Sequence, residues 1–140
     1  MKPLEGVTVL EFSTMITASF AAMMMAEQGA RVIKVEPMNV GDPMRYIGAN
    51  KGGISSLFAN CNRGKKSIRV NLKEEAGQNL IREMIGEVDI FIHNFRPGVM
   101  DKLNLGSEAL RALNPRLIYA AISGFGKEGP LGAAPAYDPI

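Results

Sequence analysis

The sequence lacks the features that would tie it to a membrane, a disulfide-rich scaffold or a nucleic acid. Its one cysteine, Cys61, excludes a disulfide within the chain and favours a reducing compartment. No apolar run approaches the roughly 20 residues of a membrane span, and Glu5 and Glu11 interrupt the region where a secretory signal would stand. A formal net charge of +2 over 140 residues gives no overall basic character. We therefore predict a cytoplasmic protein with no membrane and no nucleic-acid partner.

Two chemical signatures are also missing. No His/Cys cluster has the spacing of metal ligands, so we predict no metal site. Residues 13–19, after the first apolar run, contain no Gly-x-Gly-x-x-Gly, so they do not indicate an NAD or FAD pyrophosphate site. A lone histidine such as His93 is more often structural than catalytic, and Cys61 has no nearby histidine in the sequence to activate it.

What the chain does contain is a strand–helix–strand pattern over residues 7–36. Residues 7–12 and 31–36 are rich in β-branched side chains, and residues 17–28 carry an apolar stripe at helical spacing, followed by Gly29 as a helix-ending glycine. The stripe consists of Phe20, Ala22, Met23, Met24 and Ala26. Two strands joined through one helix by short loops must run parallel with a right-handed crossover.

The rest of the chain repeats this alternation. Further strands are predicted at residues 67–71, 88–93 and 117–123, and helices from a cap at Asn71 to Gly86, over 99–103, and from a cap at Ser107 to 113. Residues 37–53 are expected to be a loop with one turn at 44–47, followed by a short apolar piece at 54–60. We therefore predict an α/β fold: one domain over residues 1–140, with an open parallel sheet, helices on both faces, and ligands at the carboxyl ends of the strands.

A run of positive charge is the first candidate site. Residues 63–73 hold five cations and no acid: Arg63, Lys65, Lys66, Arg69 and Lys73. Such a run suits a polyphosphate or phosphorylated ribose, because each cation can make a charge-assisted contact. An exposed strand edge protected by lysines explains it equally well, and the residues alone leave both interpretations open.

Two loops that follow predicted strands are the other candidates. Arg96, and Lys102 about one turn later, could hold a phosphate while Phe95 packs against an adenine or the core, although a surface turn is the simpler explanation. Gly124 and Gly126 flank an aromatic residue and would let a ligand approach the backbone, but such loops also occur as plain turns. Residues 124–140 are rich in glycine and proline and form no predicted element, so we expect an incomplete chain.

Taken together and in order, these segments resemble the family III CoA-transferases (CaiB/BaiF type). The matching motifs are PLEGV (3–7), GARVIKVEP (29–37), GDPMR (41–45), NRGKKS (62–67), NFRPG (94–98), NPRLIY (114–119), GFG (124–126), GP (129–130) and YD (137–138). The family includes formyl-CoA, carnitine and bile-acid CoA-transferases and the related α-methylacyl-CoA racemases. The resemblance implies a Rossmann-like domain at the N-terminus of a larger, interlocked homodimer. It also implies coenzyme A or acyl-CoA and carboxylic acids as substrates, with no permanently bound cofactor.

The resemblance also assigns roles to residues. It places Met15 near the adenosine and Lys73, Asn94, Arg96 and Lys102 at CoA-contacting positions. It implies a nucleophilic aspartate beyond Ile140, so this chain holds no catalytic residue and is expected to be inactive alone. Tyr137 is an expected active-site neighbour, standing where racemases have a histidine that moves the α-proton. A phenol with a pKa of about 10 is a poor base near neutrality, which favours transferase over racemase.

Two alternatives stay open beside the transferase: a racemase or epimerase, and a non-catalytic CoA-binding module. For the transferase and for both alternatives, we expect the cations Arg63, Lys66, Arg96 and Lys102 to converge with the glycine-lined loops on one rim of the sheet.

Overall fold

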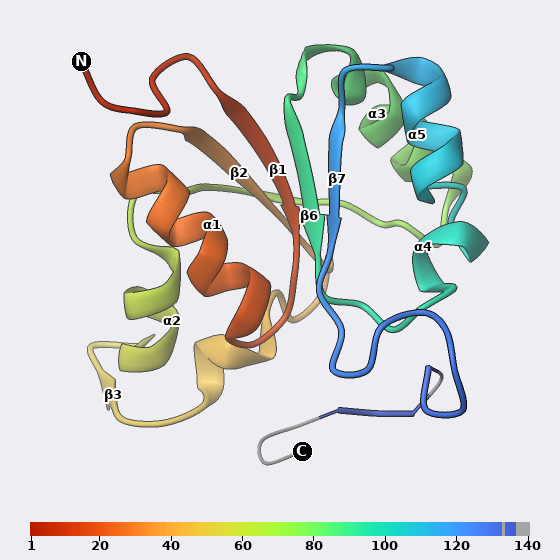
Figure 1. Ribbon diagram of the computed structural model, residues 1–140. Helices are drawn as coiled ribbons and strands as arrows, with labels where there is room; N and C mark the ends of the chain where they lie inside the picture. The colour runs from red at the N-terminus through yellow and green to blue at the C-terminus, as the bar shows by residue number, and fades with distance from the viewer. Residues whose placement is uncertain (133, 137–140) are drawn as a thin grey trace.

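A five-stranded parallel sheet forms the centre of the computed structural model, which describes residues 1–132 and 134–136 (Figure 1). The strands lie in the order β5–β2–β1–β6–β7. They are β1 (Thr8–Phe12), β2 (Arg31–Glu36), β5 (Lys66–Arg69), β6 (Ile90–His93) and β7 (Ile118–Ala121). Every neighbouring pair is parallel, which confirms the predicted α/β fold. The order reverses between β1 and β6, the switch point where doubly wound sheets bind ligands.

Helices cover the sheet from both sides (Figure 1). On one face lie α1 (Thr17–Glu27) and α2 (Ser56–Asn62); on the other lie α3 (Glu75–Met84), α4 (Val99–Lys102) and α5 (Ser107–Leu113). Because successive side chains of a strand point to opposite faces, each strand contributes residues to the packing on both sides of the sheet. Val9 and Val32 pack with α1 in one buried cluster, whereas Leu10 and Ile33 belong to a larger cluster with α3 and α5.

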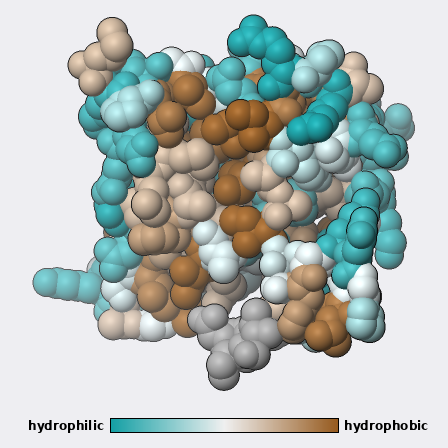
Figure 2. All heavy atoms as spheres, viewed as in Figure 1, coloured by the Kyte–Doolittle hydropathy of each residue, from teal (hydrophilic) through white to brown (hydrophobic). Residues whose placement is uncertain are grey.

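The cover is incomplete over β7. On the side where α1 lies over β1 and β2, this helix also contacts β6, where Ile92 is buried, but no helix of the described residues lies over β7 (Figure 1). Ile118 is 59% exposed there, and Figure 2 shows apolar side chains gathered over this part of the surface and over α1. Within the described residues β7 is also an edge strand, since β6 is its one partner in the sheet. This flank is therefore the largest departure from the two-sided cover that parallel sheets normally have.

Helix α1 confirms part of its predicted pattern and corrects the rest. Gly29 adopts a φ of 105° and its N–H donates to Ala26 O at 3.0 Å, so it ends the helix as predicted. Ala22 and Met23 are buried as expected. Phe20 and Met24, however, are nearly half exposed, so the predicted apolar stripe is wider than the face of α1 that the structure buries.

Two predicted helix starts differ from the structure. Helix α3 begins at Glu75, not after Asn71, because the Asn71 side chain instead accepts a hydrogen bond from Lys73 N at 3.2 Å and donates to Glu74 Oε1 at 2.8 Å. Ser107 is the first residue of α5, and the capping position is Gly106, so Ser107 does not act as the cap.

The region predicted as a loop contains more structure than expected. It holds the 3₁₀ helix η1 (Pro43–Tyr46) and the first strand of a hairpin formed by β3 (Asn50–Lys51) and β4 (Ile54–Ser55), after which α2 follows directly. Elsewhere in the chain a further 3₁₀ turn, η2 (Ile85–Glu87), follows α3. Ser55 caps α2, because its Oγ accepts from Phe58 N at 3.3 Å. Across the described residues, no helix combines the length and the apolar character needed to cross a membrane.

Candidate functional site

A buried ionic network lies beneath the carboxyl ends of β1 and β2, on the face covered by α1 and α2. Its centre is Lys34, which is 1% exposed and whose Nζ lies 2.8 Å from Glu11 Oε1 and 2.9 Å from Asp42 Oδ2. The same ammonium donates to Ser13 Oγ at 2.9 Å and Ser19 Oγ at 3.2 Å. Glu11 and Asp42 are fully buried, and burying a carboxylate costs little only where cations and hydrogen-bond donors surround it, as they do here.

Lys65 completes this network instead of joining an exposed basic patch. Its side chain is 2% exposed, and its Nζ lies 2.6 Å from Glu11 Oε2. It also donates to Ser19 O at 2.7 Å and to Asn62 Oδ1 at 2.9 Å, which uses all three ammonium donors. Burial lowers the pKa of Lys65, and the neighbouring Glu11 carboxylate opposes that shift. With Glu11, Lys34 and Asp42 it forms a balanced set of two cations and two anions.

A second ion pair holds the following loop to the end of β2. Arg45 binds Glu36 with two hydrogen bonds, Nε to Oε2 at 2.8 Å and Nη2 to Oε1 at 2.6 Å. Although burial raises the pKa of Glu36, hydrogen bonds from Arg45, Ser67 and the backbone of Asp42 lower it to about 2. Gly41 is required here, since a Cβ on it would lie 2.7 Å from Glu36 Oε2. The carboxylate is therefore ionised at neutral pH and anchors residues 41–45.

The loop after β1 is clamped at the switch point of the sheet. Asn94, directly after β6, accepts from Thr14 N at 3.1 Å and donates to Thr14 O at 2.7 Å. Met15 N donates to Asp42 Oδ1 at 3.3 Å from the other side. Met15 has a φ of 63°, in the left-handed region that non-glycine residues rarely adopt, and its side chain is partly exposed. The structure thus joins Met15 and Asn94, two sequence-predicted site residues, through Thr14.

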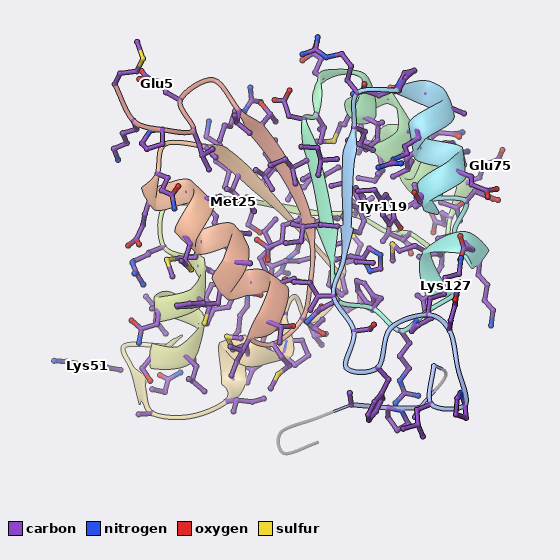
Figure 3. All side chains as sticks on the ribbon, in the orientation of Figure 1. Glu5, Met25, Lys51, Glu75, Tyr119 and Lys127 are labelled. Atoms are coloured by element: carbon purple, nitrogen blue, oxygen red, sulfur yellow. The ribbon has the colours of Figure 1, made fainter. Side chains whose placement is uncertain are left out.

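A pocket of about 220 Å³ opens between the carboxyl ends of β6 and β7 and helix α4. Arg96 and Lys127 bring positive charge to its wall and Asp101 brings negative charge. Tyr119 and Lys127, both labelled in Figure 3, lie on the α4 side of β7. Gly124 and Gly126 form the turn between the lining residues Ser123 and Lys127, and Gly126 N donates to Ser123 Oγ at 3.1 Å.

Two aromatic side chains, His93 and Tyr119, form the floor of this pocket and meet edge-on at 5.4 Å between ring centroids. Buried Phe91 packs beneath them, stacked on Tyr119 at 5.1 Å. Burial lowers the pKa of His93 to about 4, with Asp101 opposing, so the imidazole is neutral. Its Nδ1 accepts from Phe95 N at 3.3 Å, which places the ring proton on Nε2. Burial also raises the pKa of Tyr119 to about 12, and its hydroxyl donates to Leu105 O at 3.2 Å.

The predicted convergence of cations on one rim is wrong. Arg63 pairs with Glu27 at 2.7 Å, at the end of α1 that lies near the N-terminus, opposite the carboxyl edge (Figure 1). Lys66 opens the edge strand β5, which β2 and β1 separate from β6. Lys73 is exposed in the turn after β5, and Lys102 is exposed at the end of α4. Arg96 is the one member of the predicted cation set that lines the pocket. Tyr137 lies outside the described residues.

Sequence reasoning missed Glu11, Lys34, Glu36 and Asp42 as members of a site. A signal was present: ionisable residues alternate with apolar ones inside strands that were expected to be covered on both faces. A buried charge needs a partner, so that alternation indicates a paired polar cluster on one face.

Among the described residues, no group of three or more His, Cys, Asp or Glu side chains is placed to hold a metal ion.

The comparisons with known proteins agree with one another. The family model for CoA-transferase family III matches residues 4–140. An acetyl-CoA:oxalate CoA-transferase from Acetobacter aceti is 44% identical over 99% of this chain and 36% of its own length. The human succinyl-CoA:glutarate CoA-transferase is 38% identical over 100% of this chain and 32% of its own length. A crystal structure of a CAIB/BAIF family protein from Brucella suis superposes with a TM-score of 0.91 at 38% identity, covering 98% of this chain and 37% of that one. The chain thus spans about a third of the length of the relatives that it matches.

Proposed function

Because the chain belongs to CoA-transferase family III, we propose that it supplies the CoA-binding part of an enzyme that moves coenzyme A between acyl-CoA thioesters and carboxylic acids. The observation that carries this proposal is the match over residues 4–140, together with relatives that are named CoA-transferases. Residues 1–140 would be part of a single Rossmann-like domain. In the intact protein, CoA would enter and leave as a substrate.

The proposed binding surface is the carboxyl edge from the Met15 loop to the pocket of β6 and β7. Asn94 holds Thr14 in place and Asp42 holds Met15, and Arg96 lines the pocket, where its guanidinium would make charge-assisted contacts with a phosphate. The turn at Gly124 and Gly126 leaves the backbone open to a ligand. Lys127 adds a second cation to the same pocket.

The other predicted cations have different standing in this proposal. Lys102 is exposed at the end of α4, whose Met100 and Asp101 line the pocket, so it would contact such a ligand at its margin. Lys66 and Lys73 are also exposed, but β2 and β1 separate strand β5, which Lys66 opens and Lys73 follows, from the pocket. Arg63 and Lys65 already have partners, Glu27 and Glu11, so their contribution would be to the folded scaffold.

The chemistry that we propose is covalent. A carboxylate from outside this chain would attack the thioester, while binding energy from the nucleotide holds the acyl group in place. This chain alone would bind CoA without turnover, and Tyr137 would stand next to the reacting centre. We further propose that the intact protein is a cytoplasmic homodimer.

Titration calorimetry with CoA tests the binding surface. Arg96→Ala is expected to weaken binding by about tenfold or more, because one charge-assisted contact is lost. Arg63→Ala is the matched control: it removes the same side chain at the opposite edge and should leave the dissociation constant unchanged. Equal losses in both variants, or no CoA binding by the unmodified protein, would contradict the proposal. For the intact gene product, CoA transfer between acyl donors and carboxylic acids is expected, whereas deuterium wash-in at the α-carbon would identify a racemase.

A further inference from the structure

We propose that Asp42 is a positioning residue: it holds Met15 in its left-handed conformation and so shapes the edge of the sheet where CoA is proposed to bind. The ligand in this inference rests on the proposed function. The conformational role of Asp42 does not, because it follows from contacts within the described residues.

Asp42 links three segments through one buried carboxylate. Oδ1 accepts from Met44 N at 2.9 Å and from Met15 N at 3.3 Å, and Oδ2 lies 2.9 Å from Lys34 Nζ. The backbone N–H of Asp42 donates to Glu36 Oε2 at 2.8 Å, which fixes the residue itself. Since Asp42 is fully buried, the carboxylate cannot exchange these partners for water. It therefore sets the position of the loop after β1 relative to β2 and η1.

Met15 needs such a restraint. A φ of 63° is disfavoured for a residue with a Cβ and persists only where the surroundings impose it. Asn94 fixes the preceding residue, Thr14, on both its N–H and its C=O. Asp42 fixes the N–H of Met15 itself. Released from Asp42, the Met15 backbone would relax toward negative φ, and its exposed side chain would leave its present position on the edge.

Asparagine, the neutral analogue of aspartate, cannot make all of these contacts at once. It has one oxygen where aspartate has two, so its NH₂ group must face either the Lys34 ammonium or the N–H groups of Met15 and Met44. Either orientation sets donors against donors. Asp42→Asn therefore tests the restraint with little change in volume.

The deciding experiment is a double-mutant cycle on CoA affinity, measured by calorimetry. In the native background, Asp42→Asn is expected to weaken CoA binding about tenfold, because the Met15 backbone leaves the bound conformation. In a Met15→Gly background the same change is expected to cost less than about threefold, since glycine adopts positive φ without a restraint. An equal loss of CoA affinity in both backgrounds would overturn the inference. If Asp42 merely stabilised the fold, the effect of its substitution would not depend on which residue stands at position 15.

Asp89→Asn is the matched control. Its Oδ2 accepts from Thr8 N at 2.8 Å, at the amino end of β1. This variant also replaces a carboxylate that accepts a backbone N–H, but at the edge away from Met15. It should leave CoA affinity unchanged in both backgrounds, and a loss equal to that of Asp42→Asn would also overturn the inference.

A stability measurement decides the inference even if the protein binds no CoA, in which case the proposed function alone fails. With Asp42 present, Met15→Gly is expected to have a higher Tm than Met15→Ala, because alanine retains the strain at positive φ. In the Asp42→Asn background this advantage should largely disappear. If Asp42→Asn does not fold, Asp42→Glu replaces it in both cycles. The inference fails if glycine has no advantage over alanine with Asp42 present, or if the advantage is unchanged without it.

Discussion

The two faces of the sheet carry different kinds of contacts at the same carboxyl edge: buried ion pairs on one and packed aromatic rings on the other. On the α1–α2 face, Glu11 and Lys34 extend from the strands into a buried ionic network that holds two loops by directional contacts. On the α3–α5 face, His93 and Tyr119 form an aromatic floor under a pocket, with Phe91 packed beneath them. Successive residues of one strand serve opposite faces. The difference shows that loop geometry is set on one side of the sheet and cavity shape on the other.

The sharpest test of this contrast replaces two neighbouring residues of β2, one facing each layer, with methionine. Lys34→Met leaves Asp42 and Glu11 short of a cation in a buried site, and we expect the free energy of unfolding to fall by about 4 kcal/mol. Ile33→Met, one residue earlier and facing the other layer, is a near volume-conserving change expected to cost less than about 1.5 kcal/mol. Urea denaturation of both variants measures the difference.

If both methionine variants lose the same stability, the buried charges on the α1–α2 face are no more demanding than ordinary core packing. The contrast between the faces would then be one of composition and not of energetics.

The pH dependence of stability is a second way to separate the two faces. The pKa of His93 is about 4 in the fold and 6.5 in the unfolded chain, so between these values only the unfolded state binds the proton. Stability should therefore fall as pH is lowered from 6.5 to 4, by up to about 3 kcal/mol. Thermal denaturation across this range measures the loss, which should be absent in His93→Asn.

Glu36 on the other face should act in a lower window. Its pKa is about 2 in the fold and 4.5 in the unfolded chain, so its contribution is complete above 4.5 and is lost as pH falls toward 2. Glu36→Gln should flatten the curve below pH 4.5 and leave the slope between 6.5 and 4.5 intact. A slope in the upper window that follows Glu36 instead of His93 would contradict this assignment.

The smallest effect is expected from a single hydroxyl in the aromatic floor. Tyr119→Phe removes the hydrogen bond to Leu105 O while keeping the stacked rings, so the free energy of unfolding should fall by about 1 kcal/mol. Calorimetric unfolding measures this change. A loss above about 3 kcal/mol would mean that the floor depends on polar contacts as strongly as the opposite face does.

The sheet was predictable because its signals are local. Segments rich in β-branched residues at 7–12 and 31–36, with a helical stripe between them and Gly29 at its end, dictate parallel strands, and the structure has them. The residues around Ser55 were harder to predict, because α2 depends on a serine cap and on contact with α1 more than on a clear pattern of its own.

The site was less predictable because the charge of a residue does not tell whether its side chain points into the protein or into solvent. Lys65 and Lys66 are neighbours in the sequence, yet Lys65 turns inward to Glu11 while Lys66 stays in solvent. The role of Asp42 depends on Met15, 27 residues earlier in the chain, through a contact that only the folded loops create. The position of Arg96 at the carboxyl edge could be predicted because it closely follows a strand, where topology alone fixes the edge, whereas Asn94 was assigned through the family resemblance.

The exposed flank of β7 has a practical consequence for work with this chain on its own. Within the described residues the outer edge of β7 has no partner strand, and such an edge next to exposed aliphatic side chains such as Ile118 is a template on which further copies can add. Light scattering of concentrated samples should therefore rise with time, and a charged residue at position 118 should slow the growth of the particles.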